Sequence, residues 1–250
     1  MQLQIKNILF FVFFFAFVQF NVSYAGDCKY LPDFEAYYKF KFRNGITVAT
    51  GILKGKKYGK QYKIDFQGKT TKIVNLFYKI EGHTYGSVDI NTLQPLNCVY
   101  IRKLPHKSKI VYIKYVDKNK AIVKTTKTKA SKIKKEDETV TWKKSIFSPM
   151  SLYVFFMHNG FQPNKRYSKY VVISDNVHKV EIISLKAEGK TKIKTKMFRM
   201  KNGKVDASKK VEEVHAWIND LKIPVKMEYK FGMGTIECNL KKLIIETKDE

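Results

Sequence analysis

The sequence has few of the residues that build metal and redox sites. Among its 250 residues are three cysteines, Cys28, Cys98 and Cys238, with no CxxC pair, and its five histidines stand in none of the HExxH, HxH or Cys-His spacings. Structural and catalytic metal sites depend on such clusters. We therefore expect no metal and no cofactor. Three cysteines allow one disulfide in any of three pairings, or three reduced thiols, and the sequence leaves these open.

Signatures of catalysis are also missing. The chain has no Gly-x-Ser-x-Gly elbow and no P-loop, and its glycine cluster at 232–234 opens no helix. Acidic residues are few and scattered, whereas paired carboxylates for acid/base chemistry need an apolar pocket that separates their pKa values. We expect no catalytic residues and a protein that is not an enzyme. A hydrolase is a minor alternative, which would need a polar cluster in a cleft.

Arginine is scarce although the chain is strongly basic. Lys and Arg total 48 against 22 acidic residues, a formal net charge of +26, yet only Arg43, Arg102, Arg166 and Arg199 are arginines. Lysine is a hydrated point charge, whereas arginine's planar fork suits specific recognition of phosphates and bases. The lysines indicate a soluble surface first and attraction to anionic partners second. Membrane headgroups, acidic glycans or acidic proteins fit that role better than nucleic acid.

The first residues are typical of a secretory signal peptide. Lys6 precedes an apolar run from Ile8 to Phe20, and Ser23 and Ala25 supply small residues at the −3 and −1 positions. The rival interpretation is an uncleaved anchor, but this run of 13 residues, apolar except for Gln19, is shorter than the roughly 20 that span a bilayer. The sequence thus predicts cleavage after Ala25, residues 1–25 as signal peptide, residues 26–250 as a single β-rich domain, and a periplasmic location.

Alternating apolar and polar residues run through most of the remaining chain. Lys190–Met197 is the clearest case, with lysines on one face and Thr191, Ile193, Thr195 and Met197 on the other. In Lys109–Tyr115 aromatic residues interleave with lysines, which we interpret as a core face and a water face. Ile73–Gly82 is either a strand with a bulge, which we favour, or a short helical turn, and Ala130–Glu138 is an exposed loop or a fraying strand end. About a dozen short strands predict a mainly β fold, a curved antiparallel sheet or open half-barrel.

One stretch breaks the strand rhythm, at about residues 148–159. Ser148 suits an N-cap, Pro149 the first helical position and Gly160 the stop, so the sequence predicts one inserted helix. This helix is apolar around most of its surface and must be buried. It is either a plug in a packed core or one wall of a cavity for an acyl chain or apolar peptide. The candidate ligand-binding residues are Leu152, Tyr153, Phe155, Phe156 and Trp217.

Several short motifs resemble an exported bacterial family of unknown function, domain-of-unknown-function family 3108. The helix start at 148–153 is similar to that family's short helix, and Thr92–Pro95 to its mid-chain turn. The set Trp217, Asn219-Asp220, Pro224, Gly232-x-Gly234 and Leu240 resembles its terminal signature. The family usually has an arginine after the helix tyrosines, where Phe156 and Met157 stand here. The resemblance, over about 33–243, implies an exported curved sheet with an inserted helix, similar in style to periplasmic lipoprotein carriers, and implies no reaction.

These observations favour a non-enzymatic periplasmic monomer that holds a lipid or acyl chain in the concave face of its sheet. Lysines near the mouth of such a cavity would attract anionic headgroups. The alternative is an envelope assembly or scaffolding protein that binds an acidic partner or an anionic surface through its lysine-rich faces. A void beside Leu152, Phe155 and Phe156 would distinguish a binding site from a packed plug.

Overall fold

The described part of the chain forms one large sheet with two helices on it, and its strands are antiparallel except for one short pair. The computed structural model describes residues 31–42, 45–76, 79–130, 132–160, 162, 164–173, 176–187, 190–208, 212–231 and 234–246. The expected signal peptide and Cys28 lie outside these residues. Within them, no helix has both the length and the hydropathy that a membrane-spanning helix needs.

The first half of the sheet is a meander of eight strands and contains the shorter helix. Its elements are β1 (Asp33–Phe42), β2 (Thr47–Tyr58), β3 (Gln61–Thr70), α2 (Lys72–Asn75), β4 (Glu81–Asp89), β5 (Pro95–Leu104), β6 (Lys107–Asp117), β7 (Lys120–Lys129) and β8 (Lys132–Thr141).

The second half begins with the longer helix and returns by a second meander. Its elements are β9 (Ile146–Phe147), α3 (Pro149–Asn159), β10 (Arg166–Ile173), β11 (Asn176–Ala187), β12 (Lys190–Lys201), β13 (Lys204–Val205), β14 (Glu212–Ile218), β15 (Pro224–Phe231) and β16 (Gly234–Glu246).

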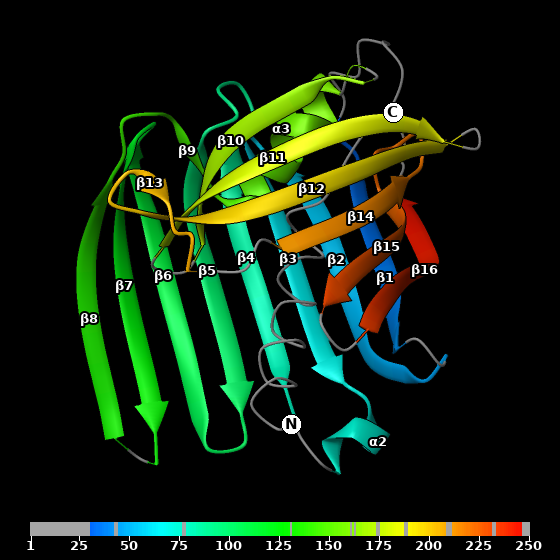
Figure 1. Cartoon of the computed structure of the whole chain (residues 1–250), viewed down its shortest axis with the longest axis horizontal. Coiled ribbons are helices and arrows are strands. Elements are labelled where there is room, and N and C mark those ends of the chain that lie inside the picture. The colour runs from blue at the N-terminus through cyan, green and yellow to red at the C-terminus, as the bar shows by residue number, and fades with distance from the viewer. Residues whose placement is uncertain are drawn as a thin grey trace.

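The two meanders join through β1 and β16, which pair antiparallel, so the strand order runs from β8 through β1 and β16 to β9. The sheet is open, because β8 and β9 are its two ends. Figure 1 shows the consequence: β10, β11, β12 and β14 pass across the first half of the sheet as a second layer, and α3 lies between the layers near one end. The curved antiparallel sheet and open half-barrel that the alternation predicts are confirmed.

Alternation along each strand decides which side chains enter the space between the layers. On β1, Phe34, Ala36, Tyr38 and Phe40 are buried, and directly paired residues on neighbouring strands share their face. We call this the inner face. The hydroxyl of Tyr100 on β5 donates to the carbonyl of Val172 on β10 at 3.3 Å, so the inner faces of the two layers meet.

Glycines let bulky rings and neighbouring backbone come close on this face. At Gly86 in β4, a Cβ would lie 2.6 Å from the carbonyl oxygen of Asn97 on β5. At Gly51 it would lie 2.9 Å from the ring of Phe66. Gly86 therefore permits a close approach between the backbones of β4 and β5.

The inserted helix begins and ends where the sequence predicts. Ser148 is the N-cap, and a capping box forms: Ser148 Oγ accepts from the amide of Ser151, and Ser151 Oγ accepts from the amide of Ser148, both at 2.9 Å. Gly160 ends α3 with φ of 63°, a left-handed value that glycine adopts without strain. Helix α3 contacts β4, β5, β9 and β10.

Two sequence expectations need correction. Ile73–Gly82 is not one strand: Lys72–Asn75 is the short helix α2, and β4 begins only at Glu81. Ala130–Glu138 is not a loop, because Lys132–Thr141 forms the edge strand β8, paired along β7. Pairing with β7 holds this segment in a strand, although its charged residues suggested an exposed loop.

We expect the substitution Gly86→Val to lower the free energy of unfolding by about 1–3 kcal/mol, since the new side chain would press against the backbone of β5. Thr84→Val is the matched control, on the same face of β4 two residues away, and we expect it to change stability by less than about 0.5–1 kcal/mol. Urea denaturation measures both variants. Equal stability of the two variants would show that close approach at Gly86 is not required.

Candidate functional site

Helix α3 fills the end of the inner face that the second layer covers. The exposed fractions of Leu152, Tyr153 and Phe156 are each 1%, and Met150 and Val154 are fully buried. Burial raises the pKa of the Tyr153 hydroxyl well above its usual value. At this end the helix residues are therefore packed as a plug, and each of the three surface hollows described below is lined without them.

Phe155 differs from its neighbours on α3 because a lysine covers it. The amine of Lys169 on β10 lies 4.3 Å from the Phe155 ring centroid and 5.3 Å from that of Phe147. These are distances at which a cation is attracted to an aromatic face. Burial lowers the pKa of Lys169, since its charged form has lost water. Lys169 therefore brings a cation to the inner face beside α3.

Trp217 lies away from the four candidate residues on α3. Its neighbours in β14, Val214, Ala216 and Ile218, are buried on the inner face, so Trp217 is on the outer face. There its ring lies between the amines of Lys192 and Lys226, at 4.9 and 5.0 Å. The structure therefore does not bring Trp217 together with Leu152, Tyr153, Phe155 and Phe156. Side chains alternate between the two faces of a strand, and this alternation places Trp217 on the outer face.

A hollow of about 600 Å³ lies between the end of β8 and the ends of β11 and β12, where the half-barrel is open. Its apolar lining comes from Val140, Trp142, Val177 and Met200, and charged residues including Glu138 and Arg199 surround them. The Trp142 ring packs against Tyr170 with centroids 5.7 Å apart. A hollow of this size and mixed lining is within the range of small-molecule sites.

Two further hollows, of about 370 and 710 Å³, lie on the outer face of the sheet, mainly over β2 to β5. His83 there contacts Asp65 at 2.8 Å, and Ser87 Oγ accepts a hydrogen bond from Asn97 at 2.9 Å. His83 and Ser87 stand four residues apart on one strand, about 13 Å, too far for a base to activate a hydroxyl. Within the described ranges, no three His, Cys, Asp or Glu residues gather as metal ligands.

The inner face changes character along β5, β6 and β7. Near α3 its positions are apolar and buried: Cys98, Tyr100, Val111, Ile113, Ala121 and Val123. Toward the other end of the same strands, two cross-strand rows continue the same face. The first row is Arg102, Lys109, Lys127 and Lys134, and the second is Leu104, Lys107, Lys129 and Lys132. Seven of these eight positions are cationic, and we call those seven the cationic end.

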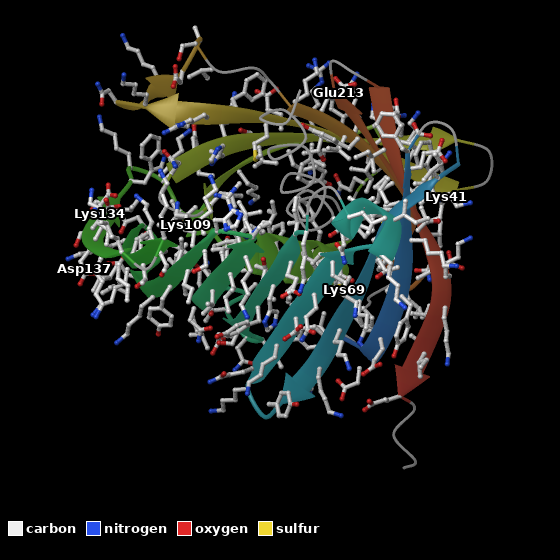
Figure 2. All side chains as sticks on the ribbon, turned by 90° about the horizontal axis from the view of Figure 1, so that it is seen from below. Lys41, Lys69, Lys109, Lys134, Asp137 and Glu213 are labelled. Carbon is white, nitrogen blue, oxygen red and sulfur yellow. The ribbon has the colours of Figure 1, made fainter. Side chains whose placement is uncertain are left out.

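The opposite face of these strands is mixed at the same level. Ile101 and Ile110 pair there, and Ile133 lies on the outer face of β8, among the lysine and hydroxyl side chains of the same rows. Ile110 and Ile133 are 41% and 65% exposed. At these positions apolar side chains face outward while the lysines next to them along the strand face inward. Figure 2 shows Lys109 in the space between the two layers and Lys134 at the open edge.

One carboxylate borders the cationic end. Glu136, next along the inner face of β8, lies 2.5 Å from the Lys127 amine and 2.7 Å from that of Lys134. These hydrogen bonds, that from Lys127 first, lower the pKa of Glu136 to about 2. The first row continues into β4 and β3 with glycines. Arg102 pairs with Gly82 on β4, and Gly82 pairs with Gly68 on β3.

The interpretation of Lys109–Tyr115 as a core face and a water face holds for most of the segment, since Val111, Ile113 and Tyr115 are buried and Ile110, Tyr112 and Lys114 are exposed. It missed Lys109, which lies partly buried on the inner face with the apolar residues. The sequence contains the information that places these lysines, because Lys107 and Lys109 stand an even number of residues before Val111 and so share its face of the strand. The sequence could not show that the second layer covers only part of the face, so the change along β6 was missed.

The lysines of β12 behave as the alternation predicts. Ile193, Thr195 and Met197 are buried on the inner face, and the amines of Lys194 and Lys196 lie on the outer side, 2.9 and 3.9 Å from Glu213. Two of the three cysteines, Cys98 and Cys238, are buried free thiols, which leaves the role of Cys28 outside the described residues. Burial raises the pKa of Cys98 to about 12, so this thiol is protonated at neutral pH.

These features define an open antiparallel β half-barrel with a helix plug at one end of its inner face and a cationic end at the other. The model of the family described as "Protein of unknown function (DUF3108)" matches residues 33–241, and the chain belongs to that family. The resemblance in its helix and turn motifs is thereby confirmed. No curated protein matches the chain.

Solved structures resemble the fold at low sequence identity. A β-barrel-like protein of the unknown-function domain DUF1849 from Brucella abortus is 14% identical, with TM-score 0.59, covering 87% of this chain and 99% of its own. An exported protein with a YmcC-like fold from Bacteroides fragilis is 5% identical (TM-score 0.35; 85% and 96% covered). A lipoprotein from Parabacteroides distasonis is 8% identical (TM-score 0.33; 85% and 95% covered). The first supports the half-barrel architecture.

We expect the Glu136 carboxyl to titrate at about pH 2 in the folded protein, against 4.5 without its partners. Because the folded pKa is the lower one, the stabilisation by this carboxylate is present above pH 4.5 and is lost as pH falls toward 2. Carboxyl-carbon NMR titration measures it. Lys127→Met should raise the pKa, whereas Lys124→Met, on the outer face of the same strand, should not. A wild-type value near 4.5 would contradict the pairing.

Proposed function

We propose that the protein is a non-enzymatic protein of the bacterial envelope that binds a lipid or acyl chain in the open part of its half-barrel. The observation that carries this proposal is the opening of about 600 Å³ between β8 and the β11–β12 end. Polar and charged residues make up most of its lining, and Val140, Trp142, Val177 and Met200 supply an apolar side that suits part of an acyl chain.

The packing of α3 bears on where the ligand would lie. The packed core includes Leu152, Tyr153 and Phe156, so these residues would form the closed end of the binding space rather than its entrance. Among the four candidate residues on α3, Phe155 is the one that is only partly buried, and Lys169 covers its ring. An acyl chain that entered beside Trp142 would thus approach α3 from the open side. In this proposal the helix is the floor that the ligand meets.

Export and the fold of related proteins support an envelope location. The amino-terminal residues are typical of a signal peptide that is cleaved after Ala25, which would deliver the protein to the periplasm. The alternative function, binding an acidic partner through outer lysines, has weaker support. On the outer face, Lys194, Lys196 and Lys226 lie beside Glu213 or Glu228, which reduces the field that a partner would meet.

The two tryptophans offer a direct test, because Trp142 lines the opening and Trp217 lies on the outer face. We expect a fatty acid brominated along its chain to quench the fluorescence of Trp142 in a Trp217→Phe variant. The same ligand should leave Trp217 unquenched in a Trp142→Phe variant, because bromine quenches only at short range. Titration of both single-tryptophan proteins measures this.

An unbrominated fatty acid of equal length is the control for changes of conformation. Quenching of Trp217 but not of Trp142 would place the ligand on the outer face and contradict the proposed opening. If neither tryptophan responds at concentrations that saturate a known fatty-acid binder, the protein does not take up acyl chains and the proposal fails.

A further inference from the structure

We propose that the cationic end is a binding site for the phosphate-bearing headgroup of an anionic lipid. This inference rests on the proposed function and names its ligand class. The site consists of Arg102, Lys107, Lys109, Lys127, Lys129, Lys132 and Lys134, on four neighbouring strands of the same inner face.

The register brings these side chains together. Arg102, Lys109, Lys127 and Lys134 stand directly opposite one another across β5, β6, β7 and β8, and directly opposed residues of an antiparallel pair have their Cβ atoms about 5 Å apart. Like charges at that spacing repel one another, and this row makes three such contacts in succession. Glu136 pairs with Lys127 and Lys134 and offsets part of this repulsion. The seven cations of the two rows outnumber this carboxylate, and the excess of positive charge favours a further anion at this end.

Protection of a sheet edge accounts for only part of the pattern. Inward-pointing lysines on an edge strand discourage pairing with another chain, which explains Lys132 and Lys134 on β8. Lys109 lies on β6 and Arg102 on β5, two and three strands from that edge, where pairing on both sides leaves nothing to protect. The exposed Ile110 on the opposite face shows that the strand gives up apolar burial to turn Lys109 inward.

The position of the cationic end points to an amphiphile rather than to a free anion. On β6, Ile113 is fully buried and Lys109 is only partly buried, four residues and about 13 Å away on the same face. The cationic end therefore borders the packed apolar core, so a headgroup held there would place an attached acyl chain against the margin of that core. Lysine binds phosphate as a point charge, and Arg102 adds one planar fork.

The test compares two single-chain phospholipids with the same acyl chain, one with an anionic phosphatidylglycerol headgroup and one with a zwitterionic phosphatidylcholine headgroup. Isothermal titration calorimetry below the micelle concentration measures their affinities for the wild type and for two double variants. Lys109→Ala/Lys127→Ala removes inner cations. Lys192→Ala/Lys194→Ala removes the same charge from the outer face of β12 and is the matched control. Glycerol 3-phosphate tests the headgroup without a chain.

We expect the anionic lipid to bind wild type at least about tenfold more tightly than the zwitterionic one, and the inner variant to lose about tenfold. The outer variant should stay within about twofold, and glycerol 3-phosphate should bind far more weakly. Equal binding of both lipids, unchanged in the inner variant, would overturn this inference and leave acyl-chain binding intact. Equally tight binding of glycerol 3-phosphate would also overturn it, in favour of a free phosphate site. Absence of binding by either lipid would overturn both proposals.

Discussion

The antiparallel ladder imposes the constraint on which this structure depends: residues paired across strands must share a face. Strand pairing runs from β8 through β1 and β16 to β9, and it is parallel only between β9 and β10. One face can therefore be followed through the sheet, apart from the bulges at which the register shifts. In β1 this face carries the buried Phe34, Tyr38 and Phe40, and strand pairing assigns the inner positions of the other strands from it, including those that lysine occupies.

The same constraint explains why the two ends of the inner face differ. Where β10 and α3 lie over the first layer, inner positions lose water and are apolar, as at Ile113 and Tyr153. Beyond that cover the face is open, and the ladder turns Lys109 and Lys127 into the same space. A half-barrel left open at one edge can thus hold a dry core and a charged surface on one continuous face. That combination suits a molecule that is itself apolar at one end and anionic at the other.

Much of this fold could be predicted from the sequence, because its main elements depend on local patterns. The capping serine at 148, Pro149 and Gly160 fix α3, and strict alternation at 190–197 fixes both faces of β12. The site was less predictable. Trp217 appeared to belong with the helix because both are apolar, but only strand pairing shows that it faces outward. Lys109 resembled an ordinary exposed lysine. Its position on the inner face has a consequence only once it is known how much of that face the second layer covers.

The most direct test of this account is native mass spectrometry of the mature protein, released from its own bacterial envelope without detergent. The account predicts additional mass on the folded protein, which on dissociation gives lipids with a phosphate-bearing anionic headgroup. The same preparation from a Lys109→Ala/Lys127→Ala strain should carry less of this lipid at equal protein recovery. Folded protein with no bound lipid, or with lipids in the proportions of the surrounding membrane in both strains, would contradict it.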